Sequence, residues 1–298
     1  MFKTCFLVAV VLLVDLHGLI QNKTHNSQQD RKMDHTSMLI LPAVLEDVPV
    51  LATISSDAFE TDSQTEMKSH GKKPFLMKEH TLESMPKQME SSRIRIIKAV
   101  EKDTGAIMGF CIWGFRGLEP PTTWEPEGDG SRHNPSPQGV ELGDRAPTTR
   151  FLPDQQEAEH EGEKKELDDP IARLEQLTSQ DLQEWSDAVM PPGASCLIVV
   201  GLSVSPDFQR RGVGSALLKW GTDIADRHHT YAWVHSSAGA WKAYQNAGFK
   251  VARVLDVDLD AFAPVPAPLE RYPGGKWGHY VFRYMVYGVQ PDVESGPS

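Results

Sequence analysis

Cysteine is scarce in this chain of 298 residues, which contains only Cys5, Cys111 and Cys196. Three scattered cysteines with no Cys-x-x-Cys pair are too few for a disulfide framework and lack the spacing of a zinc site. Cys111 and Cys196 lie in apolar, strand-like segments, where a reduced thiol packed in the core is the expected state. The sequence therefore predicts no metal site and no fold held together by disulfides.

Basic residues are also fewer than acidic residues. Lys and Arg number 30 against 41 Asp and Glu, so the formal net charge is -11 at pH 7 with His neutral. An acidic protein gains nothing from the counterion release that drives binding to nucleic acid or anionic membranes, so we expect neither as a partner. A cationic substrate such as an amine suits this sign, although charge alone does not require one.

The sequence has no apolar run long enough to span a bilayer. The run Phe6–Val14 follows Lys3 and has the length of a signal-peptide core, but no small-residue cleavage site follows it. Alternatively, translation starts at Met33 or Met38, and residues 1–37 are an artefact of gene prediction. We expect a cytoplasmic protein, with secretion as the alternative if the run is a true signal peptide.

Apolar segments of strand length alternate with amphipathic segments of helical period, which predicts an α/β (layered α+β) fold with a mixed central sheet flanked by helices. We expect strands at Met38–Ala43, Arg93–Val100, Ile107–Phe115, Cys196–Val204, Tyr231–His235, Phe249–Leu259 and Tyr280–Val289. The turn Asp103-Thr104-Gly105 joins the second and third strands as a hairpin, because Gly adopts a positive φ without strain. We expect helices at about Glu46–Phe59, Pro170–Val189 (with a division at Thr178-Ser179 if it forms two helices), Val213–Ile224 and from Ser236 or Ser237 to Ala247. The polar stretch Thr61–Ser92 has no clear period and has room for a second, irregular helix.

Residues 117–167 differ in composition from the segments on either side. Prolines interrupt this stretch, and Gly, Asp and Glu fill the gaps between them. Such a stretch cannot bury enough apolar surface to offset the entropy lost on ordering. We predict a disordered or lid-like insertion at 117–167 within one domain of residues 38–290, preceded by a tail or signal-like segment at 1–37 and followed by a tail at 291–298.

The segment after the fourth expected strand has the pattern of an anion-binding loop. A buried strand ends at Val204, Pro206 stops it, and a helix begins at about Val213. Gly212 and Gly214 let the backbone approach a ligand closely, and the amides of the helix's first turn point at a bound anion. A pyrophosphate is the expected occupant. The segment lacks the Gly-Lys-Ser/Thr of a Walker A loop and the third Gly of a dinucleotide fingerprint.

The sequence Leu202-Ser203-Val204-Ser205-Pro206, followed by Gln209-Arg210-Arg211-Gly212-Val213-Gly214, closely resembles the GNAT superfamily of acyl-CoA N-acyltransferases, of the fungal single-domain type. That family's main signature is Q/R-x-x-G-x-G/A after a strand carrying Leu-x-Val-x-Pro. Its second signature, a Tyr shortly before Gly-Phe, is matched by Tyr244-Gln245-Asn246-Ala247-Gly248-Phe249. The resemblance covers about Met38 to Gly288, and its specific part is Val200 to Phe249.

The resemblance implies acetyl-CoA as co-substrate and no metal. In the family the pantetheine arm lies along a splayed strand, which here carries Leu202, Ser203 and Val204. The implied pyrophosphate site consists of Gln209, Arg210, Arg211, Gly212, Val213, Gly214 and Ser215. The side chains of Arg210 and Arg211 either add charge-assisted contacts to phosphate or stay solvated.

The resemblance also implies that a primary amine attacks the thioester directly, without a covalent enzyme intermediate. Tyr244 is the implied acid near the sulfur, and packing on a helix face is its alternative role. The general base is left open between His235, Glu101 and a water chain. We expect the acceptor site in the first helices, the hairpin and the insertion. A homodimer is one expected assembly, and the alternative to an enzyme is a non-catalytic acyl-CoA-binding module.

Overall fold

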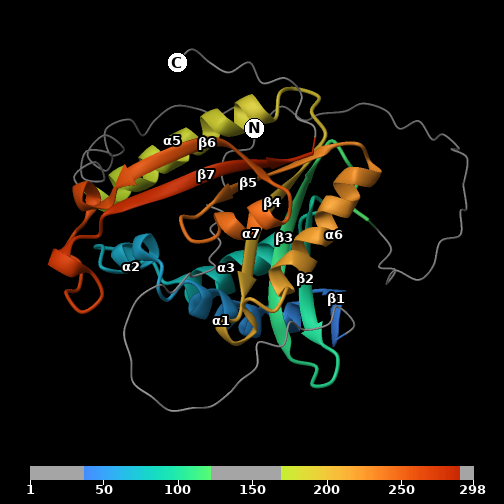
Figure 1. Ribbon diagram of the computed structural model, residues 1–298, viewed down its shortest axis with the longest axis horizontal. Helices are drawn as coiled ribbons and strands as arrows, with labels where there is room; N and C mark the ends of the chain where they lie inside the picture. Colours follow the sequence, from blue (N-terminus) through green and yellow to red (C-terminus); the bar gives the residue numbers. More distant parts are fainter. Residues whose placement is uncertain (1–36, 122–168, 289–298) are drawn as a thin grey trace, which may run out of the picture.

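The computed structural model describes residues 37–121 and 169–288, which form a seven-stranded mixed sheet with the strand order β1-β2-β3-β4-β5-β7-β6 (Figure 1). Every neighbouring pair is antiparallel except β4 and β5, which are parallel. The strands are β1 (Met38–Pro42), β2 (Ile94–Glu101), β3 (Ile107–Arg116), β4 (Cys196–Val204), β5 (Tyr231–Ser236), β6 (Lys250–Asp258) and β7 (His279–Tyr287). The predicted α/β fold with a mixed central sheet is confirmed.

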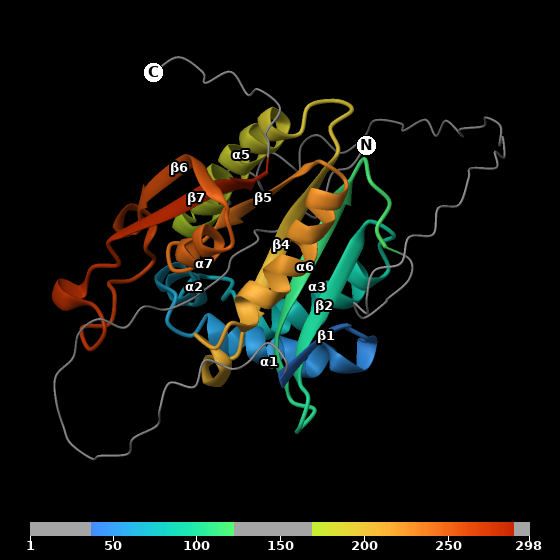
Figure 2. The same ribbon diagram turned by 45° about the vertical axis from the view of Figure 1, so that its right-hand side comes forward.

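Helices cover both faces of this sheet. They are α1 (Val48–Ala58), α2 (Ser63–Ser69), α3 (Met77–Met89), α5 (Pro170–Val189), α6 (Val213–Arg227) and α7 (Trp241–Asn246). On one face, Leu217 of α6 belongs to the same buried cluster as Trp113 of β3. On the other face, Leu51 of α1 and Met85 of α3 share a cluster with Phe110. Figure 2 shows α6 lying along β4, and α1 also contacts this strand, so helices cover both of its faces.

Local signals explain the hairpin and the start of α5. Gly105 has a φ of 72° in the β2–β3 turn, as the hairpin prediction requires. The Asp169 carboxylate accepts a hydrogen bond from the Ile171 amide at 3.1 Å and caps α5. The helix then runs unbroken past the expected division, and within it the Thr178 hydroxyl donates to the Leu174 carbonyl at 3.0 Å.

Two other helical segments differ from the expectations. The polar stretch after α1, which has no clear period, forms α2 and α3, and each helix buries one methionine, Met67 and Met85. The helix expected from Ser237 is shorter, because β5 continues to Ser236 and α7 begins only after Ala240.

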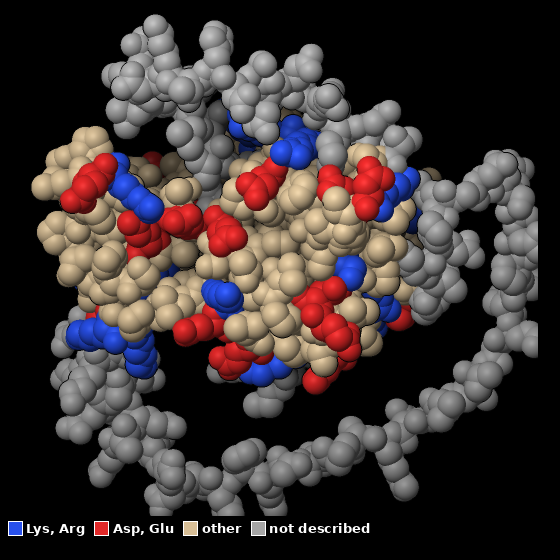
Figure 3. Space-filling view, turned by 90° about the horizontal axis from the view of Figure 1, so that it is seen from below, with Lys and Arg blue, Asp and Glu red and all other residues tan. Residues whose placement is uncertain are grey.

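Most of the predicted insertion at 117–167, and most of both predicted tails, lie outside the described residues. Of the insertion only 117–121 are described, as a loop in which the Gly117 carbonyl accepts a hydrogen bond from the Ser195 hydroxyl at 3.0 Å. No helix among the described residues is both long and apolar enough to cross a bilayer. Acidic and basic side chains are interspersed over the face drawn in Figure 3.

Candidate functional site

The parallel strands β4 and β5 separate partway along their length. They pair from Cys196 opposite Tyr231 to Val199 opposite Val234. Beyond Val199, β4 continues to Val204 with no strand partner on its β5 side in the described part of the chain. Its other edge stays paired with β3, with a register shift opposite Ile112 and Trp113. Unpaired peptide groups at a strand edge can hydrogen-bond an extended ligand.

The loop after β4 holds its backbone in a conformation suited to an anion. Arg210 has a φ of 60° and Gly212 a φ of 87°. The Gln209 side-chain amide donates to the Val204 carbonyl at 3.2 Å, which fixes the start of the loop against the strand. Gly212 is the N-cap of α6 and offers no side-chain acceptor to the helix. The first amides of α6, starting at Val213, therefore have no partner inside the helix and can bind an anion.

A cavity of about 700 Å³ opens between this loop and the segment around α7. Its lining contains Val204 and the predicted residues Gln209, Arg210, Gly212, Val213, Gly214 and Ser215. The opposite wall comes from Ala238 to Asn246, including Lys242, which the sequence analysis had not singled out. Arg210 and Lys242 bring positive charge to the cavity, as phosphate binding requires.

Three of the predicted cofactor residues do not line the cavity. Leu202 is packed in the core beside α6. Ser203 faces a second hollow on the opposite side of the sheet. The Arg211 guanidinium lies over the Phe208 ring at 5.3 Å, an arrangement that keeps it in the loop. Their backbone atoms belong to the strand edge and the loop, so a role through the backbone stays a prediction.

Tyr244 is more deeply buried than expected. Its side chain is 0% exposed, and its hydroxyl has no hydrogen-bond partner among the described residues. The ring lies edge-on to Phe249, with 5.6 Å between the ring centres. Burial raises the pKa of its phenol, and the nearby Cys111 raises it further. A phenol in this environment stays protonated and can act only as an acid, so the predicted role remains a prediction.

The two predicted bases lie in different surroundings. His235 is 1% exposed and stacks between Phe282 and Tyr284, with ring centres at 4.8 and 4.6 Å. Burial lowers the pKa of its imidazole to about 3, so the ring is neutral and a weak base. Glu101 accepts a hydrogen bond from the Thr104 hydroxyl at 2.6 Å in the hairpin turn. Neither residue lines the 700 Å³ cavity.

Asp62 is an acidic group in the cavity wall that the sequence analysis missed. It caps α2, and its Oδ1 accepts hydrogen bonds from the amide and the hydroxyl of Thr65, both at 2.8 Å. Its Oδ2 accepts one from the Tyr280 hydroxyl at 2.8 Å. Burial raises the pKa of this carboxyl, although the hydrogen bonds from Thr65 and Tyr280 oppose the rise. The sequence signal was a helix N-cap, which by itself points only to structure.

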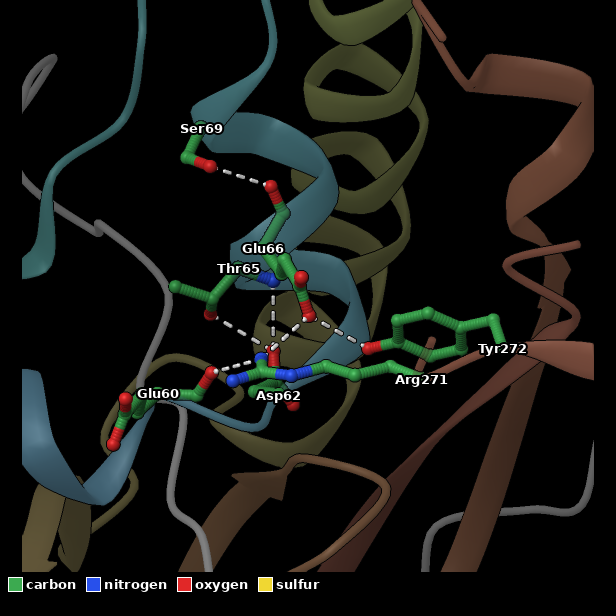
Figure 4. Close-up of polar contacts among 7 residues, drawn as sticks. All are labelled: Glu60, Asp62, Thr65, Glu66, Ser69, Arg271 and Tyr272. Carbon is green, nitrogen blue, oxygen red and sulfur yellow. Dashed lines mark hydrogen bonds and ion pairs between the residues drawn. The ribbon is translucent and has the colours of Figure 1, made fainter. Parts of the chain in front are cut away.

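The turn that carries Asp62 is tied to a distant part of the chain. Figure 4 shows Glu66 of α2 accepting hydrogen bonds from Arg271 at 3.1 Å and from the Tyr272 hydroxyl at 2.9 Å. Arg271 also donates to the Glu60 carbonyl at 3.1 Å. These contacts fix both ends of the turn, so the Asp62 carboxylate has a defined position in the cavity wall.

A second, smaller hollow lies on the other face of β4. Its volume is about 210 Å³, and its walls come from α1, α2, α3, α5, β3 and β4. Ser203 lines this hollow, whereas the next residue, Val204, lines the larger cavity. Thr65 lines the hollow too, and its hydrogen-bond partner Asp62 lines the larger cavity. The end of β4 and the start of α2 thus form a common wall.

Residues 179–249 match the model of the acetyltransferase (GNAT) family. This match includes both signatures on which the resemblance rested, so the recognition is confirmed for this segment. No curated protein matches the chain.

Solved structures with a similar arrangement include several acetyltransferases. The polyamine N-acetyltransferase of Drosophila melanogaster is 15% identical, with 85% of this chain and 100% of that chain covered at a TM-score of 0.47. The mosquito arylalkylamine N-acetyltransferase like 5b is 13% identical, with coverage of 85% and 100% and a TM-score of 0.47. A histone acetyltransferase HPA2-related protein of Corynebacterium glutamicum is 15% identical, with coverage of 86% and 99% and a TM-score of 0.42. Likenesses this remote do not define a substrate.

Proposed function

We propose that this chain, whose residues 179–249 match the acetyltransferase (GNAT) family, transfers an acetyl group from acetyl-CoA to a primary amine by direct attack. The observation that carries the proposal is the continuity between the unpaired edge of β4 and the anion-binding loop that follows it. Both border the 700 Å³ cavity, so a long ligand with an anionic end can contact both.

The residues present suit acetyl-CoA, which would supply the acetyl group as an activated thioester. The amides at the start of α6 would hold the pyrophosphate, with Arg210 and Lys242 adding charge. The unpaired edge of β4 from Leu202 to Val204 would hydrogen-bond the amides of the pantetheine arm. These assignments agree with the roles implied by the family.

The transfer requires one bond to form and one to break. The amine nitrogen bonds to the carbonyl carbon, the carbon–sulfur bond breaks, and the sulfur leaves as a thiolate that takes up a proton. We assign the proton released by the amine to the Asp62 carboxylate, which lines the larger cavity and accepts a hydrogen bond from Thr65 in the lining of the smaller hollow. Its raised pKa brings it nearer to the working pH, which makes a carboxylate a better base. Tyr244 stays the proposed acid for the sulfur.

A second candidate function rests on the burial of Tyr244. Its side chain is 0% exposed and belongs to the core rather than to the cavity lining. A protein without an accessible acid could bind acyl-CoA and transfer nothing, as a sensor or an interaction domain does. Both candidates should bind acetyl-CoA, so only a measurement of turnover distinguishes the acetyltransferase from the acyl-CoA-binding module.

A pair of glycine substitutions tests the cofactor site. Gly212 and Gly105 both have positive φ values, of 87° and 72°, and an added Cβ at either meets no atom within 4 Å. Each substitution to Glu therefore carries the same strain of about 1–2 kcal/mol and the same charge. Only Gly212 borders the cavity, so Gly212→Glu should weaken acetyl-CoA binding about a hundredfold while Gly105→Glu leaves it unchanged.

The measurement is calorimetric titration with acetyl-CoA, followed by thiol release in the presence of n-pentylamine, 2-phenylethylamine or putrescine. If the Gly212→Glu variant binds acetyl-CoA with wild-type affinity, the loop is not part of the cofactor site and the proposed function is refuted. Binding of acetyl-CoA without thiol release from any of the amines would favour the acyl-CoA-binding module.

A further inference from the structure

The smaller hollow has the size and lining of a site for an apolar group. Its volume is about 210 Å³, and an engineered cavity of roughly 150 Å³ in another protein is large enough to bind benzene. Much of its wall is apolar and comes from Phe59, Phe75, Met85, Phe110 and Ile112. A small aryl-alkyl or alkyl body therefore fits this space.

The hollow also borders the same end of β4 as the proposed cofactor cavity. Ser203 borders it, and the neighbouring Val204 borders the cofactor cavity. Beyond Val199 the strand carrying both residues has no partner on its β5 side among the described residues, so no second strand closes that edge. Thr65, whose hydroxyl donates to Asp62, also lines the hollow.

The charged groups of the hollow do not favour an acceptor that carries a second positive charge. Its ionisable lining residues are Lys68, His80 and Glu175 in the described part of the chain. The Lys68 ammonium pairs with the Glu175 carboxylate at 2.7 Å, and the lysine is the more buried partner, with side-chain exposures of 13% and 53%. Lys68 also lies over the Phe75 ring at 4.7 Å. The negative charge of Glu175 is therefore already paired with the Lys68 ammonium.

His80 does not change this balance. Burial lowers the pKa of its imidazole, and the nearby Lys68 lowers it further. The ring is therefore neutral at pH 7 and contributes neither a counter-charge for an ammonium nor a second repulsion. Asp62 lines the larger cavity and not this hollow, so its carboxylate does not pair with a second ammonium bound inside the hollow.

We propose that this hollow is the acceptor site and that it takes a primary amine carried on a small, uncharged apolar body, while the Lys68–Glu175 pair excludes acceptors with a second ammonium group. The proposal rests on the proposed function and names its substrate class. Lys68 is thus a residue that determines specificity, and it acts by occupying the carboxylate that a diamine would need.

Two matched amines isolate the second charge. n-Pentylamine and putrescine have chains of the same length when the terminal groups are counted. They differ only in that n-pentylamine ends in a methyl group where putrescine ends in a second ammonium. Binding of each is measured by calorimetry on full-length protein saturated with CoA, so the measurement needs no turnover. We expect n-pentylamine to bind at least about tenfold more tightly than putrescine, because putrescine meets Lys68 and no unpaired carboxylate.

Two variants test the ion pair itself. Lys68→Met keeps the apolar stem of the side chain and releases Glu175, so putrescine should gain about tenfold in affinity while n-pentylamine changes little. Glu175→Gln is the matched control, since it removes the carboxylate and leaves the cation, and putrescine should gain nothing. Unchanged thermal midpoints would show that both variants keep the fold.

Each adverse outcome has a distinct meaning. Putrescine binding as tightly as n-pentylamine in the wild type would overturn the substrate class, and no gain in Lys68→Met would overturn the role of the pair. Failure of both amines to bind the CoA complex would overturn the acceptor site and leave the cofactor site standing. Failure of CoA itself to bind would remove the proposed function, and the acceptor proposal with it.

Discussion

Replacing Asp62 with Asn is the sharpest test of the proton acceptor. The change keeps a side-chain oxygen for the Thr65 amide, and Asn caps helices about as well as Asp. The Tyr280 hydroxyl, which donates to Oδ2, can instead accept from the new amide group. The variant should therefore fold normally while losing the only carboxylate in the lining of the 700 Å³ cavity, as far as the described residues go.

The expected loss comes from the size of general base catalysis. A positioned base contributes roughly 10²–10⁴ in rate, so Asp62→Asn should lower kcat/KM for n-pentylamine by about a hundredfold or more. That loss corresponds to about 2.7 kcal/mol or more of transition-state stabilisation. The affinity for acetyl-CoA should change little, because the proposed phosphate contacts are in the loop after β4, whereas Asp62 belongs to the turn before α2.

The pH dependence gives a second readout. A base must be ionised to accept a proton, so wild-type kcat/KM should rise as the pH passes upward through the raised pKa of Asp62. Asp62→Asn should lose this part of the profile and keep only the rise due to deprotonation of the amine, whereas Asp62→Glu should retain it. A variant within about threefold of the wild type, with the same profile, would refute the assignment of Asp62 as the base.

The ionisation of Asp62 should also affect folding stability, which should fall as the pH rises, whereas the activity should rise. The folded pKa of Asp62 lies above its ordinary value of 3.8, so folding favours the protonated form. This contribution to stability is fully present below the unfolded pKa and is lost as the pH rises through the folded pKa. Asp62→Asn carries no such penalty, so its thermal midpoint relative to the wild type should increase from acid to neutral pH.

Two further substitutions test packing and the acid. Gly221→Ala would place a Cβ 2.3 Å from the Trp113 ring and should lower the unfolding free energy by about 1–3 kcal/mol in a denaturant titration. Gly214→Ala on the same helix is the control, because its Cβ would meet Val204 at an ordinary 3.7 Å. Equal stability of the two variants would contradict the close packing of α6 on β3. Tyr244→Phe removes a buried hydroxyl without a partner, so stability should not fall, and thiol release should slow if the hydroxyl protonates the sulfur. An unchanged rate would assign Tyr244 to packing.

The loop after β4 could be predicted from sequence because its conformation is set locally. Gly212 adopts a positive φ where the sequence places a glycine, and Val213 begins a helix where the apolar period begins. The hairpin at Gly105 could be predicted for the same reason. Local chemistry also explains α5, whose start at Asp169-Pro170 carries both a cap and a proline suited to the first helical position.

The remainder of the site depends on contacts between distant segments. Asp62 reads as a helix cap in sequence, and its place in the cavity wall depends on Tyr280, which is 218 positions away. The burial of Tyr244 depends on how α7 packs against Phe249 and the sheet. The point at which β4 leaves β5 depends on strand pairing, which no local pattern around Val199 encodes. Sequence therefore predicted the loop after β4 and Tyr244, but not Asp62, whose position in the cavity wall depends on distant contacts.

The two cysteines in the described part of the chain offer no nucleophile for a covalent acyl-enzyme. A covalent acyl-enzyme would need an activated nucleophile next to a base. Cys111 and Cys196 are both 0% exposed, and burial raises the pKa of Cys196 to about 11 and that of Cys111 well above its usual value. Neither thiol forms the reactive thiolate at neutral pH, and neither lines the two hollows. Ser203 and Val204 are neighbours at the end of β4 and line one hollow each, so an amine and a thioester bound one in each hollow would lie on either side of the end of this strand.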